Sequence, residues 1–293
     1  MKKKKILVLG SSGFLGSHLT NILLSNGHDV IQFDSIPPAK QNSDSQFILG
    51  SILNMGHLQK AMSGIDIVYH FAAMTDIDIV EQNPAQAIEV NIAGTTNVLE
   101  ASIQEKVDRI IFSSSVYVYS EYGGVYKSTK QACELLIEDY FNMHGLPYTI
   151  LQLGSAYGPG AKKTNLIGKF IKEALNNNEI IHDGNGEEIR QYIYVEDVAR
   201  TAMALMEEKY MGKKVILLGN EKIKISELMA EIQSQINRNI KLVFNQDDYG
   251  IHYKETPFST EPNGAIFFDS TNGVPIKKGI EKTITSAKIE IGI

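Results

Sequence analysis

Short apolar runs alternate with longer amphipathic stretches along the first two-thirds of the chain. The apolar runs show little internal alternation and cover residues 6–9, 30–33, 65–71, 109–112 and 148–153. Helical spacing of apolar positions covers residues 14–26, 84–103 and 126–144. Strands that are apolar on both faces and separated by helices are typical of a parallel sheet covered on both sides. Because crossovers between parallel strands are right-handed, the pattern predicts an α/β fold with a doubly wound parallel sheet.

The pattern changes after Tyr157-Gly158-Pro159-Gly160. A connection containing glycine and lysine leads to a helix expected over residues 165–176, and a second helix is expected near residues 225–236. Between them, Asp183-Gly184-Asn185-Gly186 is typical of a hairpin turn. We therefore expect two domains. The large domain is expected to comprise residues 1–155 with 187–215 returning to it, and a small C-terminal substrate-binding domain is expected to comprise residues 156–186 and 216–293.

Composition and charge narrow the class of protein. The 293 residues carry a formal net charge of −6, which does not favour a nucleic acid or a membrane surface as a partner. No apolar run approaches the roughly 18 residues that cross a bilayer. Cys133 is the only cysteine, and the seven histidines show no metal-ligand spacing. We expect a cytoplasmic protein that holds no metal.

Three glycines stand at the junction between the first predicted strand and the first predicted helix, in Gly10-Ser11-Ser12-Gly13-Phe14-Leu15-Gly16. Backbone N–H groups in such a turn can approach a pyrophosphate at the positive end of the helix dipole. A tight turn with no ligand is the alternative. The second strand ends at Asp34, about 20 residues further on, where a carboxylate can bind the ribose hydroxyls. Since that carboxylate repels a 2′-phosphate, we predict NAD as the cofactor.

The G-x-x-G-x-x-G spacing resembles the extended branch of the short-chain dehydrogenase/reductase superfamily. Tyr69-His70-Phe71-Ala72-Ala73 and Asn91-Ile92-Ala93-Gly94-Thr95 match further landmarks of that branch, while Gly50-Ser51-Ile52 has Ser51 where the family has Asp. The resemblance implies a Rossmann-type sheet with bound NAD. The implied cofactor-binding residues are Gly10, Gly13, Phe14, Leu15, Gly16, Asp34, Ser35, Ser51, Ile52, Phe71, Ala72, Ala73, Asn91, Ser113, Tyr126 and Lys130.

Tyr126 and Lys130 stand four residues apart, so on a helix they share one face. A phenol titrates near pH 10, and bringing it near neutrality requires on the order of 4 kcal/mol of preferential stabilisation of the phenolate. The Lys130 ammonium can supply part of it. The same spacing recurs at Tyr210 and Lys214, but only Tyr126 follows a strand that ends in serines, Ser113-Ser114-Ser115.

In the family, a hydroxyl at the end of that strand completes a Ser-Tyr-Lys triad, and Ser115 best matches the position. That the serines merely terminate a strand is the alternative. Sugar 4,6-dehydratases of the family place an Asp-Glu pair next, whereas this chain has Val116-Tyr117. The resemblance therefore favours epimerisation, in which C4 of a sugar is transiently oxidised and then reduced on the other face.

The second half of the chain resembles nucleotide-sugar epimerases. Arg190 opens a block, Arg190-Gln191-Tyr192-Ile193-Tyr194-Val195-Glu196-Asp197, that matches the family segment whose Arg grips a diphosphate. A guanidinium fork suits phosphate oxygens, although a surface Arg beside Glu187 and Glu188 is the alternative. The resemblance implies substrate contacts from Thr75, Ser155, Asn165 and Arg190. Gln152 and Ser155 stand where the family has Arg and Asn, and the stretch from Ser115 to Tyr126 is short.

The predicted function is thus NAD-dependent epimerisation of a nucleotide-diphosphate sugar. A ketosugar reductase or dehydratase of the same family is the first alternative, and an NAD-binding protein without turnover is the second. Apolar positions in residues 84–103 and 126–144 exceed what one sheet face needs, and relatives pair these helices. We therefore expect a homodimer.

Overall fold

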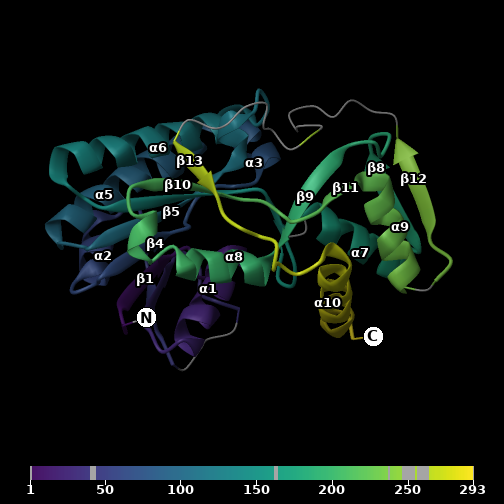
Figure 1. Ribbon diagram of the computed structural model, residues 1–293, viewed down its shortest axis with the longest axis horizontal. Helices are drawn as coiled ribbons and strands as arrows, with labels where there is room; N and C mark the ends of the chain where they lie inside the picture. Colours follow the sequence, from purple (N-terminus) through teal and green to yellow (C-terminus); the bar gives the residue numbers. More distant parts are fainter. Residues whose placement is uncertain are drawn as a thin grey trace.

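The computed structural model describes residues 2–39, 44–161, 164–236, 238–245, 255 and 264–292. Its largest element is an eight-stranded sheet of order β13-β10-β6-β5-β4-β1-β2-β3, in which all strand pairings are parallel (Figure 1). The strands are β1 (Lys5–Leu9), β2 (Asp29–Asp34), β3 (Gln46–Leu49), β4 (Ile67–His70), β5 (Arg109–Ser115), β6 (Tyr148–Leu153), β10 (Lys213–Leu217) and β13 (Ala265–Phe267). The predicted Rossmann-type parallel sheet is confirmed.

Helices cover both faces of this sheet because its strands are apolar on both sides. In β1, Leu7 and Leu9 pack into the core under α2, α5 and α6, whereas Ile6 and Val8 pack against α1 and α8. The helices span α1 (Phe14–Ser25), α2 (Met55–Met62), α5 (Gly94–Gln104), α6 (Gly124–His144) and α8 (Val195–Ala204). Because the strands are parallel, their carboxyl ends lie at the same edge of the sheet, which is where ligands bind in such folds.

The helix predicted over residues 84–103 is interrupted. It consists of α4 (Pro84–Ile88), a π-helical segment Glu89–Ala93 and α5. Asn91 lies in the π-helical turn, where it is buried and its side chain forms hydrogen bonds with the backbone of Met74. The apolar spacing of an α-helix does not predict this direction of the Asn91 side chain. Short α3 (Ile77–Gln82) precedes α4. The strand predicted over 109–112 continues to Ser115, so all three serines belong to β5.

A second apolar core lies at the other end of the molecule (Figure 1). It is built by α7 (Leu166–Asn177), α9 (Ile225–Ile236) and α10 (Ile276–Glu290) with two small sheets. One sheet has the order β11-β9-β7 and the other pairs β12 with β8. The strands are β7 (Ser155–Tyr157), β8 (Glu179–Asp183), β9 (Ile189–Tyr194), β11 (Lys222–Lys224) and β12 (Lys241–Asn245).

The predicted hairpin at residues 183–186 is wrong. β8 pairs in parallel with β12, and β9 pairs with β11 and β7, so the strands on either side of the turn join different sheets. The turn is held from elsewhere, because the Gly186 carbonyl accepts a hydrogen bond from Ser226 N at the start of α9. Two strands also depart from the predicted domain division: β13 lies in the large sheet and β9 in a small one.

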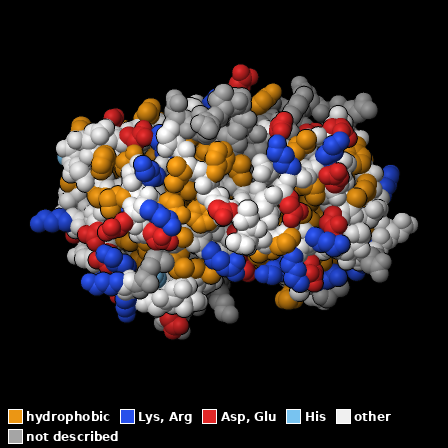
Figure 2. Space-filling model, in the orientation of Figure 1, with side chains coloured by type: hydrophobic (Ala, Val, Ile, Leu, Met, Phe, Trp, Pro, Cys, Tyr) orange, Lys and Arg blue, Asp and Glu red, His pale blue; other side chains and the backbone are white. Residues whose placement is uncertain are grey.

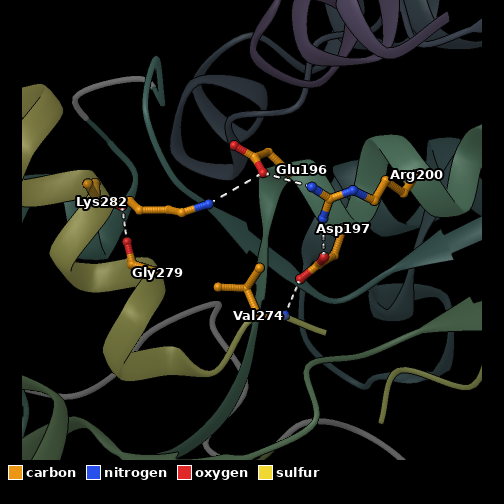
Figure 3. A network of polar contacts seen from close by, with 7 residues as sticks. Glu196, Asp197, Arg200, Val274, Gly279 and Lys282 are labelled. Atoms are coloured by element: carbon orange, nitrogen blue, oxygen red, sulfur yellow. Dashed lines mark hydrogen bonds and ion pairs between the residues drawn. The ribbon is translucent and has the colours of Figure 1, made fainter. Parts of the chain in front are cut away.

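A polar network ties the C-terminal segment to α8 (Figure 3). Asp197 accepts hydrogen bonds from Val274 N at 2.7 Å and from Arg200 at 3.1 Å. Glu196 bonds Arg200 at 3.0 Å and lies 3.5 Å from Lys282 Nζ of α10. Asp197 thus braces the segment that leads into α10, which connects the large sheet to the second core.

Figure 2 shows Lys and Arg side chains interspersed with Asp and Glu over one face of the molecule. Within the described residues, no helix has both the length and the apolar character needed to cross a bilayer. No cluster of three or more His, Cys, Asp or Glu side chains in that part of the chain is arranged to hold a metal ion.

Candidate active site

The opening glycine turn is held by backbone packing. Gly10 has φ +86°, and a Cβ there would lie 2.6 Å from Ala72 N, so the turn sits directly on the segment after β4. A Cβ on Gly16 would lie 2.1 Å from the Gly10 carbonyl oxygen, so glycine at this position lets α1 approach the turn closely. Gly10 is therefore required by the protein's own backbone as well as by any ligand at the turn.

Asp34 closes the turn on its other side. Its Oδ2 accepts a hydrogen bond from Ser12 N at 2.9 Å, and its Oδ1 accepts one from Ile36 N at 3.2 Å. Each carboxylate oxygen has a second lone pair, so Asp34 can still accept hydrogen bonds from a ribose. Asp34 and Ser35 both line the cleft described next.

A cleft of about 1300 Å³ runs along the carboxyl edge of the large sheet and reaches β8, β9 and α7. Its volume exceeds the roughly 300–1,000 Å³ that is usual for one small ligand. With the exception of Asn91, all the predicted site residues line it: Gly10, Gly13, Phe14, Leu15, Gly16, Asp34, Ser35, Ser51, Ile52, Phe71, Ala72, Ala73, Thr75, Ser113, Ser115, Tyr126, Lys130, Ser155, Asn165 and Arg190.

Asn91 lies behind the cleft wall. Its side chain accepts from Met74 N at 2.8 Å, donates to Met74 O at 3.0 Å and donates to Thr129 Oγ1 at 3.1 Å. Both polar atoms of the amide bind protein groups, and the residue is 2% exposed. The predicted direct contact of Asn91 with the cofactor is thus replaced by a bracing role for the segment that includes Met74.

Two features place Tyr126 in the first turn of α6. Gly123 caps the helix with φ +96°, a conformation that favours glycine. Glu81 of α3 accepts a hydrogen bond from Val125 N at 2.7 Å and so satisfies a free N–H of the first turn. Tyr126 is 8% exposed and packs against Ile77, Val80 and Ala87. Tyr117 meets it edge-on with ring centroids 6.2 Å apart.

Lys130 lies one turn further along α6 and is buried. Its Nζ donates to the Ser113 carbonyl at 2.7 Å and lies 4.6 Å from the centroid of the Phe112 ring. Burial lowers the pKa of Lys130 to about 8, against the opposing effects of Cys133 and Glu134. Ser115, at the end of β5, accepts from Tyr117 N at 3.3 Å. The three predicted catalytic side chains thus come from β5 and α6 and line one cleft.

The far end of the cleft holds the predicted substrate residues. Arg190 is 6% exposed and lines the cleft, which excludes the alternative that it is a surface Arg. Glu187 pairs with Lys224 at 2.6 Å, and Glu188 pairs with His182 at 3.1 Å. Asn165 begins α7: its Oδ1 accepts from Gly168 N at 3.3 Å and its Nδ2 donates to Ala156 O at 2.8 Å.

Several residues at the cleft were not predicted to belong to the site, and four of them carry polar groups that bear on its chemistry. Lys169, His182 and Tyr117 line the cleft, and Glu134 lies beneath it with a hydrogen bond to Ser114. Two of them carry a signal in the sequence: Glu134 follows Lys130 by four residues and so shares its helix face, and Tyr117 stands two residues after Ser115.

The sheet, its glycine turn and the cleft at its carboxyl edge define a Rossmann-type α/β protein. The model of the NAD dependent epimerase/dehydratase family matches residues 6–219, so the chain belongs to that family. The predicted cofactor, NAD, is the cofactor of this family.

Similar proteins act on nucleotide sugars. UDP-N-acetyl-alpha-D-glucosaminuronate decarboxylase of Bacillus cytotoxicus is 30% identical over 82% of this chain and 83% of its own length. UDP-glucuronate 4-epimerase of Thermodesulfobacterium geofontis is 24% identical over 97% of this chain and 96% of its own length. The solved UDP-glucuronic acid 4-epimerase of Bacillus cereus, in complex with UDP-glucuronic acid and NAD, superposes with a TM-score of 0.86 at 27% identity, covering 98% and 99% of the two chains.

Proposed function

We propose that this protein epimerises a nucleotide-diphosphate sugar at C4 through a triad of Ser115, Tyr126 and Lys130. The observation that carries the proposal is the single cleft that joins the opening glycine turn, these three side chains and Arg190. Its volume of about 1300 Å³ suits a dinucleotide and a sugar nucleotide side by side.

The residues at one end of the cleft fit NAD. The turn from Gly10 to Gly16 offers backbone N–H groups at the N-terminus of α1 for the pyrophosphate. Asp34 offers carboxylate oxygens for the ribose hydroxyls, and the lining places no Arg beside it for a 2′-phosphate. When bound there, NAD supplies the acceptor and the donor of the C4 hydride.

The triad handles the proton of the C4 hydroxyl. Tyr126 accepts that proton when the sugar is oxidised and returns it when the keto group is reduced. Ser115 donates a hydrogen bond to the same oxygen. Lys130, whose ammonium is buried, stabilises the Tyr126 phenolate by its charge.

The other end of the cleft offers groups for the diphosphate. The Arg190 guanidinium suits paired phosphate oxygens. Asn165, Ser155 and Thr75 also line the cleft and offer polar atoms to the sugar and the phosphates.

The residues after Ser115 favour epimerisation over elimination of water. Val116 is 1% exposed and packs against Ile216, so it offers no proton carrier. Tyr117 faces the cleft with a phenol, which is a weak base at neutral pH. The keto intermediate is then reduced again instead of losing water.

A second candidate, decarboxylation of a nucleotide uronate, is favoured by the 30% identity to the B. cytotoxicus decarboxylase. Oxidation at C4 makes the C6 carboxylate of a uronate a β-keto acid, which can release CO₂ with the bonding electrons passing to the C4 carbonyl. The same triad would serve the oxidation. The two reactions differ in their products, since one keeps C6 and the other loses it as CO₂.

The test is a panel of UDP-, GDP-, dTDP- and CDP-sugars and uronates, followed by NMR. We expect a C4 epimer from at least one of them and no steady-state change in free NAD(H). Tyr126→Phe should retain NAD binding and lose turnover. Tyr210→Phe is the matched control, because Tyr210 lies in a 3-10 turn next to the amino end of β6. Unchanged activity of Tyr126→Phe would refute the triad, CO₂ release would establish the second candidate, and net NAD(H) consumption would indicate a reductase.

We also propose that the protein is a homodimer that pairs through α4 and α6. These helices expose apolar side chains, with Leu135 62% and Ile88 50% exposed. Ordinary surfaces bear single apolar side chains, but several on neighbouring helices favour association.

A further inference from the structure

A buried carboxylate lies one helical turn beyond Lys130. Glu134 of α6 is 5% exposed and contacts both central strands, β5 and β6. Ser114 Oγ donates to its Oε1 at 2.5 Å, and Gln152 Nε2 lies 3.0 and 3.1 Å from its two oxygens. Buried carboxylates are costly unless they are both hydrogen-bonded and paired with a cation.

The cation comes from a third strand. Lys214 of β10 places its Nζ 3.4 Å from Glu134 and 3.0 Å from Glu138. Gln152 stands at the position where the resemblance to the family predicts an Arg. It is neutral and fully buried, so it supplies a hydrogen-bond donor that carries no charge. Tyr119 donates to Gln152 Oε1 at 2.8 Å, which turns the amide N–H group toward Glu134.

This arrangement joins α6 to β5 at two consecutive residues. Lys130 holds the Ser113 carbonyl at 2.7 Å, and Glu134 holds the Ser114 hydroxyl at 2.5 Å. The next residue is Ser115. Side chains alternate along a strand, so the bond to Ser114 fixes the backbone while the side chain of Ser115 points to the opposite side. The strand end that carries Ser115 is thereby attached to the helix that carries Tyr126 and Lys130.

Glu134 is also the carboxyl group whose electrostatic effect favours the charged form of Lys130. Three titratable side chains interact electrostatically with the Lys130 ammonium: Cys133 and Glu134 on α6, and His70 on β4. Burial raises the pKa of Cys133 and lowers that of His70 to about 3, so both are neutral near pH 7. The carboxylate of Glu134 favours the charged form of Lys130 against the effect of burial.

We propose that Glu134, with Lys214 as its counter-ion, is a positioning residue that keeps Ser115 in register with Tyr126 and Lys130. The inference rests on the proposed function for its effect on turnover. Its structural part, the attachment of β5 to α6, is independent of any substrate.

The test compares Glu134→Gln with Glu138→Gln. Glu138 is the matched control: it lies on the same helix and binds the same Lys214 but has no hydrogen bond to β5. In Glu134→Gln, Lys214 keeps Glu138 as a partner, which limits the loss of stability. We expect kcat to fall by about tenfold to a hundredfold with little change in KM, because misplacement of catalytic groups acts on the reacting step. The alkaline limb of the pH profile should move to lower pH by about one unit, as Lys130 loses its proton more easily.

A readout without turnover accompanies the kinetics. Amide hydrogen exchange of residues 109–119 should speed up in Glu134→Gln and stay unchanged in Glu138→Gln. Ser114→Ala removes the hydrogen bond between Ser114 and Glu134 but keeps the Glu134 carboxyl group. It should therefore speed amide exchange and lower kcat, while the alkaline limb of the pH profile stays where it is in the wild type. Should Glu134→Gln fail to fold, Ser114→Ala decides alone.

Wild-type rates of amide exchange together with a wild-type kcat in Glu134→Gln would overturn the inference. If Glu134→Gln does not fold, the same result in Ser114→Ala would overturn it. Equal effects in Glu138→Gln would overturn it as well, because they would indicate general destabilisation. A wild-type protein that acts on no sugar nucleotide would instead refute the proposed function. The exchange experiment would still test whether Glu134 attaches β5 to α6.

Discussion

Replacing Gly16 by alanine tests how the opening turn is built. The new Cβ would lie 2.1 Å from the Gly10 carbonyl oxygen, 2.9 Å from the Gly10 carbonyl carbon and 3.0 Å from Ser11 Cα. All three atoms are backbone, so no flexible side chain can give way. Restoring an ordinary contact of roughly 3.4 Å requires α1 or the turn to move by about 1.3 Å.

Such a displacement should weaken both the fold and the binding of NAD. Overpacking of this kind costs about 1–3 kcal/mol of unfolding free energy. The N–H groups of the turn move with it, and the loss of a single hydrogen bond to a charged group is worth about 1.5–3 kcal/mol. We expect the Kd for NAD to rise by about tenfold or more, measured by calorimetric titration, and the Tm to fall by several degrees.

Gly56→Ala is the matched control for Gly16→Ala. Gly56 also lies near the start of a helix, but its Cβ would meet only Asn54 Oδ1, at 3.4 Å. Alanine there should leave NAD binding unchanged and add about 0.5–1 kcal/mol of stability. If Gly16→Ala bound NAD as tightly as the wild type and unfolded at the same temperature, the close approach of α1 to the turn would not be what shapes the site.

Three further predictions follow from the site and the surface. Because burial lowers the pKa of Lys130 to about 8 and its charged form stabilises the phenolate, kcat/KM should be retained below pH 8 and decline above it; a flat profile to pH 9.5 would contradict this role. Arg190→Lys keeps the charge but loses the guanidinium fork, so the KM for the sugar nucleotide should rise about tenfold while the Kd for NAD stays constant; an unchanged KM would remove Arg190 from the diphosphate site. If the protein is the proposed homodimer, Leu135→Asp should convert it to a monomer in sedimentation, and a wild-type monomer at micromolar concentration would exclude the dimer.

Local signals predict five strands of the large sheet, which are β1, β2, β4, β5 and β6, and the turn between β1 and α1. Gly10 and Gly16 act within a few residues of each other, at the first strand–helix junction, and their spacing alone indicates the turn. Tyr126 and Lys130 are one helical turn apart, so their common face also follows from spacing. The lining of one cleft by twenty predicted residues reflects the rule that parallel strands present their carboxyl ends at one edge.

Contacts between distant segments could not be predicted in this way. The residues flanking the turn at 183–186 look like a hairpin, yet β8 finds its partner in β12 and β9 finds partners in β7 and β11. Asn91 lies in a family motif, but the direction in which its side chain points depends on a π-helical turn and on its hydrogen bond with Met74. The cation beside Glu134 is Lys214, eighty positions further along, which reaches it only because β10 lies beside β6.

In the proposed reaction the C4 hydrogen of the sugar leaves and returns within one active site. The most direct test uses a nucleotide sugar that carries deuterium at C4, incubated with the purified protein in ordinary water and followed by NMR and mass spectrometry. We expect a C4 epimer that keeps its deuterium at C4, and we expect Tyr126→Phe to form no epimer. An epimer whose deuterium has exchanged with solvent would contradict it.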